Sequence, residues 1–430
     1  MINADFNHAL LQEAVDAMPK DVLSALRTSS AEKFAETGFP TLRDEDWRYT
    51  NMARAINLSN DWLANTGTAP HKIAGEAAAI RSSIDAHWVL IQNGSIDIGS
   101  DSLPDGVSVE LLSDKSADWD VQEIAVDNAM AQLNAALITD GLRLTVTAGT
   151  SLDKPIGFLI DDQATQGPVV AQSRVLIDIH EGASANFIEA HLSSGDSEHF
   201  ANNVVQINLS RNATIDYLRL QQRARHHIHT SRLTADLAEN ATFRHCAFDF
   251  GGSLVRNDIV ARLHGRNANA LLNGLYLAGD KQHIDNHTRV DHLVGPGYSS
   301  EEYRGILNRK SRCVFNGKAI VHVGADGTDA NQSNHNLLLS GDAEIDTKPE
   351  LEIYADEVKC SHGATVGQLD ETALFYLRSR GLDETQATQL ITRAFAAKVL
   401  SLLTVDAARD YIAAATDQRL DSLIGDDGHE

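Results

Sequence analysis

A short pattern recurs at a nearly constant interval in the middle of the chain. Each copy begins with Gly or Asn, then Ala, and continues with alternating residues; the copies are Gly182–Phe187, Asn212–Tyr217, Asn240–His245 and Asn267–Leu272. Their alanines are separated by 30, 28 and 27 residues. Gly and Asn tolerate a positive φ, so each copy is typical of a chain that turns a corner and re-enters a strand. The nearly constant period predicts a solenoid, in which each repeat packs on its neighbours.

The repeat lies within a long stretch of strand-like sequence. From about residue 86 to 368 apolar residues recur with a period of two, and Trp88–Gly94 reads as a strand that ends in an Asn-Gly turn. A helical insertion is expected near 120–139, where the apolar spacing is helical instead. A β-sandwich would place turn signals about every 8 to 12 residues, much closer than the interval seen here. We therefore predict a mainly β fold, a parallel β-helix.

Both ends of the chain have helical patterns. Residues 1–85 carry apolar residues at helical spacing, which predicts an N-terminal helical region. Residues 369–430 are predicted to form a C-terminal helical domain, in which Asp370 and Asp383 are N-caps and Gln386 completes a capping box. The β-helix is expected to occupy the part between them.

The last predicted helices carry a wide apolar stripe that includes Leu390, Ile391, Phe395 and Val399. Most of such a stripe packs on its neighbours, but a partner protein can bind part of it. We therefore expect these four residues to contribute to partner binding. Removal of the chain after about residue 370 is expected to leave a folded β-helix that no longer binds this partner.

Charge and composition exclude several classes of protein. The 430 residues include 36 Lys or Arg and 60 Asp or Glu, a net charge of −24, which disfavours binding to nucleic acid or an anionic membrane. Three widely spaced cysteines are too few for a disulfide framework. The first residues do not resemble a signal peptide, and no run of about 18 apolar residues occurs, so we expect a cytoplasmic protein.

The sequence lacks the motifs of common hydrolytic sites. The Walker-type phosphate loop, Gly-x-Ser-x-Gly and His-Glu-x-x-His are all missing, so we expect no catalytic turnover. His227 and His229 could hold a metal between them on one strand face, but polar residues on a solvated sheet face are the favoured interpretation. For His283, His287 and His292 metal binding is also the less favoured alternative.

The segment Cys360-Ser-His362 is the most suggestive metal-binding pattern. At positions i and i+2 of a strand, a thiolate and an imidazole point to one face, where one soft metal can bridge them. Gly363 follows directly and allows close backbone approach. From spacing alone, a buried thiol beside a satisfied histidine is the favoured alternative, because Val358 shares their parity and is suited to an inward position.

A much longer motif contains these residues. Leu337–Gly367 closely resembles the signature of the SufB/SufD family of iron–sulfur cluster assembly scaffold proteins. The extension Gln368–Leu382 and the N-terminal motif Trp47–Thr50 are similar to the SufD branch of that family. Gly363 stands where SufB-like chains usually carry Glu, which also favours the SufD branch. The resemblance is densest over about 280–400.

The resemblance implies a flattened right-handed parallel β-helix with helical ends and a non-enzymatic scaffold role. It implies pairing with a SufB-like subunit through the C-terminal end of the β-helix, or a homodimer when the chain is isolated. A SufC-like ABC ATPase would bind the C-terminal helices, and ATPase and cysteine desulfurase activities would belong to partner proteins. A transient iron–sulfur cluster would form at the SufB interface, where Cys360 and His362 are the expected metal ligands. Reduced flavin is associated with such complexes, but the sequence contains no flavin motif that we can identify.

An alternative remains open from the fold class alone. Parallel β-helices are common among carbohydrate-active lyases and hydrolases, so a cytosolic enzyme of this kind is the second candidate. Such an enzyme would need clustered acids or bases along a groove.

Overall fold

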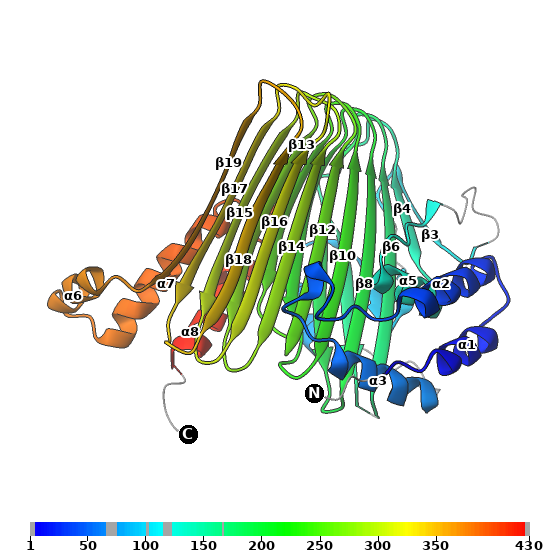
Figure 1. The fold of residues 1–430 in the computed structure, drawn as a ribbon, viewed down its shortest axis with the longest axis horizontal. Coiled ribbons are helices and arrows are strands. Elements are labelled where there is room, and N and C mark those ends of the chain that lie inside the picture. The colour runs from blue at the N-terminus through cyan, green and yellow to red at the C-terminus, as the bar shows by residue number, and fades with distance from the viewer. Residues whose placement is uncertain (1–4, 66–74, 100–102, 115–122, 166, 426–430) are drawn as a thin grey trace.

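The computed structural model describes residues 5–65, 75–99, 103–114, 123–165 and 167–425, and its central part is a parallel β-solenoid (Figure 1). From β4 (Leu142–Val146) to β19 (Lys359–Gln368), successive strands alternate between a nine-stranded and a ten-stranded sheet. Within each sheet, parallel strands of neighbouring coils pair in register, as where Ile228–Leu237 lies beside Phe200–Leu209. The predicted parallel β-helix with helices at both ends is confirmed.

The ten-stranded sheet, called sheet A, contains β1 (His87–Gln92), β2 (Ser95–Asp97), β5 (Ile156–Gln163), β7 (Ser184–Ser194), β9 (Thr214–Gln222), β11 (Thr242–Asp249), β13 (Asn269–Ala278), β15 (Tyr298–Leu307), β17 (Asp329–Leu338) and β19 (Lys359–Gln368). The nine-stranded sheet, called sheet B, contains β3 (Val107–Leu111), β4 (Leu142–Val146), β6 (Val169–Ile179), β8 (His199–Leu209), β10 (Ile228–Leu237), β12 (Leu254–Leu263), β14 (His283–His292), β16 (Arg312–Val321) and β18 (Glu344–Ile353). The described helices are α1 (His8–Ala17), α2 (Ser24–Thr37), η1 (Glu45–Trp47), α3 (Ala53–Ala64), α4 (Gly75–Ser83), α5 (Ala129–Leu137), α6 (Glu371–Ser379), α7 (Glu384–Leu400), η3 (Asp406–Ala408) and α8 (Arg409–Gly425).

The recurring pattern marks one corner of the solenoid. Gly182, Asn212, Asn240 and Asn267 have φ of 67°, 58°, 56° and 57°, the left-handed conformation that these residue types tolerate. The asparagines also form a ladder, because the Asn240 side-chain amide donates to Asn212 Oδ1 at 2.9 Å and Asn267 to Asn240 at 3.1 Å. The predicted corner therefore has two causes, a permissive backbone and stacked side-chain amides.

The three largest apolar clusters of the described residues have distinct places in the fold. One fills the solenoid interior between the two sheets. A second lies between the outer face of sheet A and the helices α7 and α8, and a third lies between sheet B and the N-terminal helices with α5. In Figure 1 the N-terminal helices lie against sheet B, whereas α6 and α7 extend beside β19 at the other end.

The second cluster changes one expectation. Val399, Ile412, Leu420 and Leu423 of the C-terminal helices pack on apolar side chains of sheet A such as Phe248. Removal of residues after 370 would expose this face to water, and an exposed apolar face of this kind promotes aggregation. The structure therefore argues against a stable β-helix after that truncation, because α7 and α8 are part of the core.

The expected helix near 120–139 is shorter than predicted. Helix α5 begins at Ala129, because Asn128 is extended (φ −146°, ψ 170°) and its side chain accepts the Ala131 N–H as an N-cap. Residues 115–122 lie outside the described residues. The predicted Asn93-Gly94 turn is confirmed, since both residues have positive φ and join the antiparallel strands β1 and β2.

None of the described helices is both long and apolar enough to cross a membrane.

Candidate functional site

The C-terminal end of the solenoid leaves both sheets with an open edge. Within the described residues, β19 pairs only with β17 in sheet A, and β18 pairs only with β16 in sheet B. Because no later coil covers this end, apolar side chains remain exposed, with Ile353 44%, Tyr354 60% and Val366 50% accessible. An open strand edge next to exposed apolar side chains is a template for pairing with another chain.

Cys360 and His362 lie on β19 at this open end. In the register of sheet A they pair with Ala330 and Gln332, which are buried and face the interior. Cys360 and His362 therefore point toward the mouth of the solenoid, on one face as predicted. His362 is exposed, whereas Cys360 is half-buried, and this burial raises the pKa of the Cys360 thiol.

The two side chains form only part of a metal site. No group of three or more His, Cys, Asp or Glu side chains in the described part of the chain is arranged to hold a metal ion. Gly363 does not make a close approach in this structure, because a Cβ there would meet no atom within 4 Å. A thiolate and an imidazole at an open edge could contribute to a metal site whose remaining ligands come from another chain.

The apolar stripe of α7 is largely used within the molecule. Val399 is fully buried in the cluster on sheet A, and Phe395 lies under Arg304, whose guanidinium carbon is 4.8 Å from the ring centroid. Ile391 is half-buried, and Leu390 is 48% exposed. The sequence did not separate inner from outer positions of this stripe, because the helix contacts β13 and β15 over a broad face.

Helix α6 carries the most exposed aromatic side chains of the C-terminal part. Phe375 is 74% and Tyr376 55% exposed. Phe375 lines an open pocket of about 770 Å³ together with Leu374, Arg378 and Leu382. Sequence analysis did not single out these residues, although an aromatic pair on a short capped helix was visible.

The N-terminal motif Trp47–Thr50 clamps the chain onto the outer face of sheet B. Arg256 lies under Trp47, with its guanidinium carbon 4.4 Å from the ring centroid. The Thr50 hydroxyl is 2.8 Å from His283 Nε2 and donates to Asp285. The motif therefore holds the N-terminal helices against β12 and β14.

The favoured interpretation of the histidine-rich segment before and within β10, polar residues on a solvated sheet face, is wrong. His227 and His229 are fully buried and do not lie on a solvated face. His229 Nδ1 accepts from Arg223 Nε at 3.1 Å, and His227 Nδ1 is 2.6 Å from the Ser193 hydroxyl. Burial and the nearby cation lower the pKa of His227 to about 4. On β14, His292 is also buried, whereas His283 and His287 are only partly covered.

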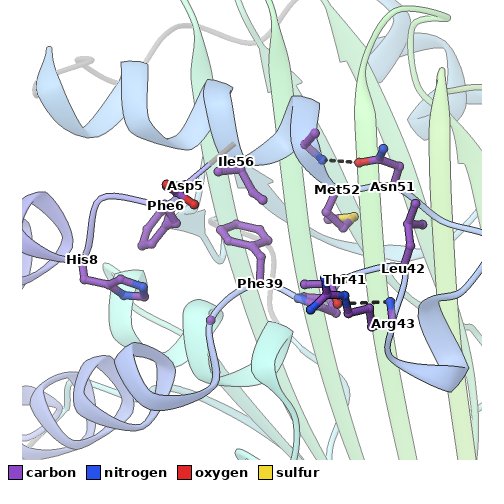
Figure 2. A pocket seen from close by; sticks show the side chains of 13 residues that line it. Asp5, Phe6, His8, Phe39, Thr41, Leu42, Arg43, Asn51, Met52 and Ile56 are labelled. Carbon is purple, nitrogen blue, oxygen red and sulfur yellow. Dashed lines mark hydrogen bonds between the residues drawn. The ribbon is translucent and has the colours of Figure 1, made fainter. Parts of the chain in front are cut away.

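Another pocket lies among the N-terminal helices. Figure 2 shows this cavity of about 420 Å³ among the N-terminal helices, where Phe6, Phe39, Met52 and Ile56 supply much of its wall. Its lining includes no cysteine, and helix α3, which borders it, contacts β6 and β8 rather than the last coils. The open end therefore remains the candidate functional site.

Comparisons with known proteins agree with this architecture. Residues 158–395 match the model for "SUF system FeS cluster assembly, SufBD core domain", and residues 7–158 match that for "SufBD protein N-terminal region". The chain is 32% identical over 394 residues to the iron–sulfur cluster assembly protein SufD of Escherichia coli (strain K12), covering 90% of this chain and 91% of that protein. It is 26% identical to protein ABCI7, chloroplastic, of Arabidopsis thaliana, covering 91% and 85%.

A relative that aligns with less of the chain carries the name of the other branch. The iron–sulfur cluster assembly protein SufB of Bacillus subtilis (strain 168) is 29% identical over 277 residues, covering 63% of this chain and 58% of that protein. Both family models and the alignment along nine-tenths of the chain point to one assignment. The chain belongs to the SufBD family of the SUF system for iron–sulfur cluster assembly.

Proposed function

We propose that this chain is the SufD-type scaffold subunit of a SUF complex and pairs with a SufB-like subunit through its open end. The single observation that carries the proposal is the pair of unpaired edges, β18 and β19, beside exposed apolar side chains. Two solenoids joined there would extend both sheets and cover the mouth of the interior. Copurification of the chain with a SufB-like subunit from the same organism tests this pairing. Loss of pairing when charged residues replace Tyr354 and Val366 would support it.

The cluster under assembly would be bound at that joint as cargo. Cys360 and His362 supply a thiolate and an imidazole, two of the donor types that iron–sulfur centres use. An incomplete ligand set on each chain suits a cluster that must later be released. The exposure of His362 makes it the more accessible of the two ligands.

Substitution of His362 by alanine is expected to lower the cluster content of the assembled complex at least about tenfold, because a direct ligand is lost. The variant should pair normally and unfold within about 0.5 kcal/mol of the parent, since the side chain is exposed. Iron and sulfide analysis of the purified complex measures the effect. Ser361→Ala is the matched control, because Ser361 lies on the opposite face and bonds Asn331 at 2.6 Å. Intact cluster yield in His362→Ala, or loss of pairing, would remove the ligand assignment.

We propose that the C-terminal helices bind the SufC-like ATPase mainly through the exposed aromatic face of α6. The apolar stripe of α7 contributes to this binding through Leu390, which is the one clearly exposed residue of the four expected there. Val399 belongs to the core instead. Exposed aromatic side chains that line a pocket are typical anchors of protein interfaces.

Substitution of Phe375 by alanine is expected to weaken ATPase binding about 30-fold, equivalent to an anchor worth about 2 kcal/mol. The unfolding midpoint should not change, because the ring is 74% exposed. Val323→Ala is the control, since Val323 is 83% exposed but lies on a solenoid corner. Titration of the immobilised ATPase with each variant gives the affinities, and equal affinity for Phe375→Ala and the parent would refute the docking surface.

We further propose that the chain itself has no catalytic turnover. The alternative of a carbohydrate-active enzyme needs a groove with a carboxylic acid of raised pKa. A groove of about 440 Å³ on sheet B does contain acids, but Asp127 contacts Arg232 and Asp291 contacts Arg289. Burial raises the pKa of both carboxyls, but the guanidinium groups lower it more, so both pKa values lie below the usual range. Such paired acids are poor proton donors, and release of reducing sugar from polysaccharides by the purified chain would contradict this proposal.

A further inference from the structure

The interior of the solenoid is polar along one side, although its other side is apolar. Glu301 and Tyr303 on β15 share their parity with Leu307, which belongs to the interior apolar cluster, so all three face inward. The same register places Arg219 and Asp249 in the interior, on β9 and β11. All of these polar side chains are buried. Buried charge of this kind is costly and needs partners.

A first hydrogen-bonded network lies around Arg219. Its guanidinium donates to Asp249 at 2.9 Å and also to Asn257. Asn257 in turn donates to Asn286 on the next coil at 2.8 Å. The network therefore links three consecutive coils through the interior.

A second network lies around Glu301, nearer the open end. Thr288 donates to Glu301 Oε2 at 2.6 Å, and Gln332 donates to Oε1 at 3.4 Å. Gln332 is the register neighbour of His362 on β19, the last strand of the sheet. The carboxyl group of Glu301 is thus two coils from the exposed mouth.

Four polar atoms in and between these networks have no hydrogen-bond partner among the described residues. They are Arg219 Nε, Asn286 Nδ2, the Tyr303 hydroxyl and Gln332 Oε1. The Tyr303 ring lies over Gly274 of β13, one coil before Glu301 and on the side of the first network. Each buried polar group without a partner costs about 1–3 kcal/mol, and internal water is the usual way in which proteins satisfy such groups.

We propose that the polar side of the solenoid interior binds a column of water molecules that exchanges a proton between the Glu301 carboxyl and solvent at the open end. In this exchange the carboxyl O–H bond breaks, the proton passes along the water column past Gln332, and solvent at the mouth accepts it. The carboxylate remains inside. The proposal goes beyond the scaffold role, and its test needs neither partner nor cluster.

Glu301 has the chemistry for such exchange. It is only 3% exposed, and no Lys, Arg or His in the described ranges forms an ion pair with it. Burial raises the pKa of Glu301 to about 7, although the hydrogen bonds from Thr288 and Gln332 lower it. The titratable groups that face this region are Arg219, His245 and Asp249 on the earlier coils, Tyr276 on β13, Tyr303 on the same strand, Cys313 on β16 and His362 on the last strand. Burial also raises the pKa of Asp249, but Asp249 is paired with Arg219, whereas Glu301 accepts hydrogen bonds from neutral side chains.

Infrared spectroscopy of the full chain tests the proposal. The carbonyl band of a protonated, buried carboxyl should disappear with a midpoint near pH 7 in the parent. It should be missing from Glu301→Gln and remain in Glu302→Gln, whose side chain lies on the outer face and pairs with Arg304. On transfer to D₂O, the band should shift in the parent long before the core amides exchange.

Two further variants test the route. Gln332→Leu should slow the deuterium shift at least about tenfold, because exchange then needs local opening of the coil. Tyr303→Phe should leave the rate near that of the parent, since the Tyr303 ring lies over Gly274 of the preceding coil, on the side away from the open end. Titration of the carboxyl near pH 4.5, or exchange as slow as the core amides, would overturn the proposal. An unchanged rate in folded Gln332→Leu would overturn the route to the open end.

Discussion

Arg256→Ala is expected to lower the free energy of unfolding by about 3–5 kcal/mol, because it removes the cation from a buried charge cluster. Arg256 is 1% exposed and contacts Asp285 at 2.6 Å and Asp258 at 2.8 Å. Its guanidinium also donates to the Asp46 carbonyl and lies under Trp47. The variant therefore loses the cation that pairs with the two carboxylates. It also loses the side chain on which Trp47 of the N-terminal motif packs.

Urea denaturation followed by circular dichroism gives the free energy. Arg289→Ala is the control, because Arg289 is half-exposed and pairs with Asp291 on its own strand, so its loss should cost less than about 1 kcal/mol. Arg256→Lys should fall between the two, since an ammonium keeps the charge but not the forked contacts. Equal stability of Arg256→Ala and Arg289→Ala would show that the clamp is not held by this charge cluster.

Glu301→Gln is expected to stabilise the folded chain by about 3 kcal/mol above pH 8 and to change little near pH 4.5. Burial raises the pKa of Glu301 from 4.5 to about 7, so the folded state binds more protons than the unfolded state between these values. Stability linked to this group is therefore present at low pH and is lost as pH rises to about 7. Glutamine resembles the protonated form and does not ionise, so the variant avoids that loss.

The measurement is the difference in unfolding free energy between variant and parent from pH 4.5 to 9, in which the other titrating groups cancel. Glu302→Gln, on the outer face of the same strand, should show no such rise. A constant difference across this range would mean that Glu301 keeps an ordinary pKa, and the proton-exchange proposal would fail with it.

The fold could be predicted because its main determinant is local. A Gly or Asn at each corner, followed by a short alternating strand, specifies the same turn every 27 to 30 residues, and identical coils stack only in a solenoid. The signals that begin and end the C-terminal helices are equally local. Asp383 and Gln386 form the predicted capping box, and Gly381 has φ of 99° after α6. Helix α5 was overextended, because one side-chain cap at Asn128 decided its start.

The candidate site was only partly accessible from sequence. Parity alone placed Cys360 and His362 on one face of a strand, and the structure places that strand at an open edge. Parity could not tell that His227 and His229 face a polar interior, because polar residues in a strand usually indicate solvent. The stripe of α7 likewise looked available for a partner, since only the position of sheet A shows that Val399 is covered.

The sequence by itself determined the repeat, the corners, the helix caps and the pairing of a thiol with an imidazole on one strand face, since each depends on residues a few positions apart. Only the tertiary structure decided which polar side chains lie in the interior and which aromatic side chains stay exposed. Glu301, Thr288 and Gln332 come from three different strands. These side chains come together only because the two sheets close around a common axis. The same closure buries Glu301, and this burial raises its pKa. Burial is a property of the whole packed molecule, so no local pattern of residues could specify it.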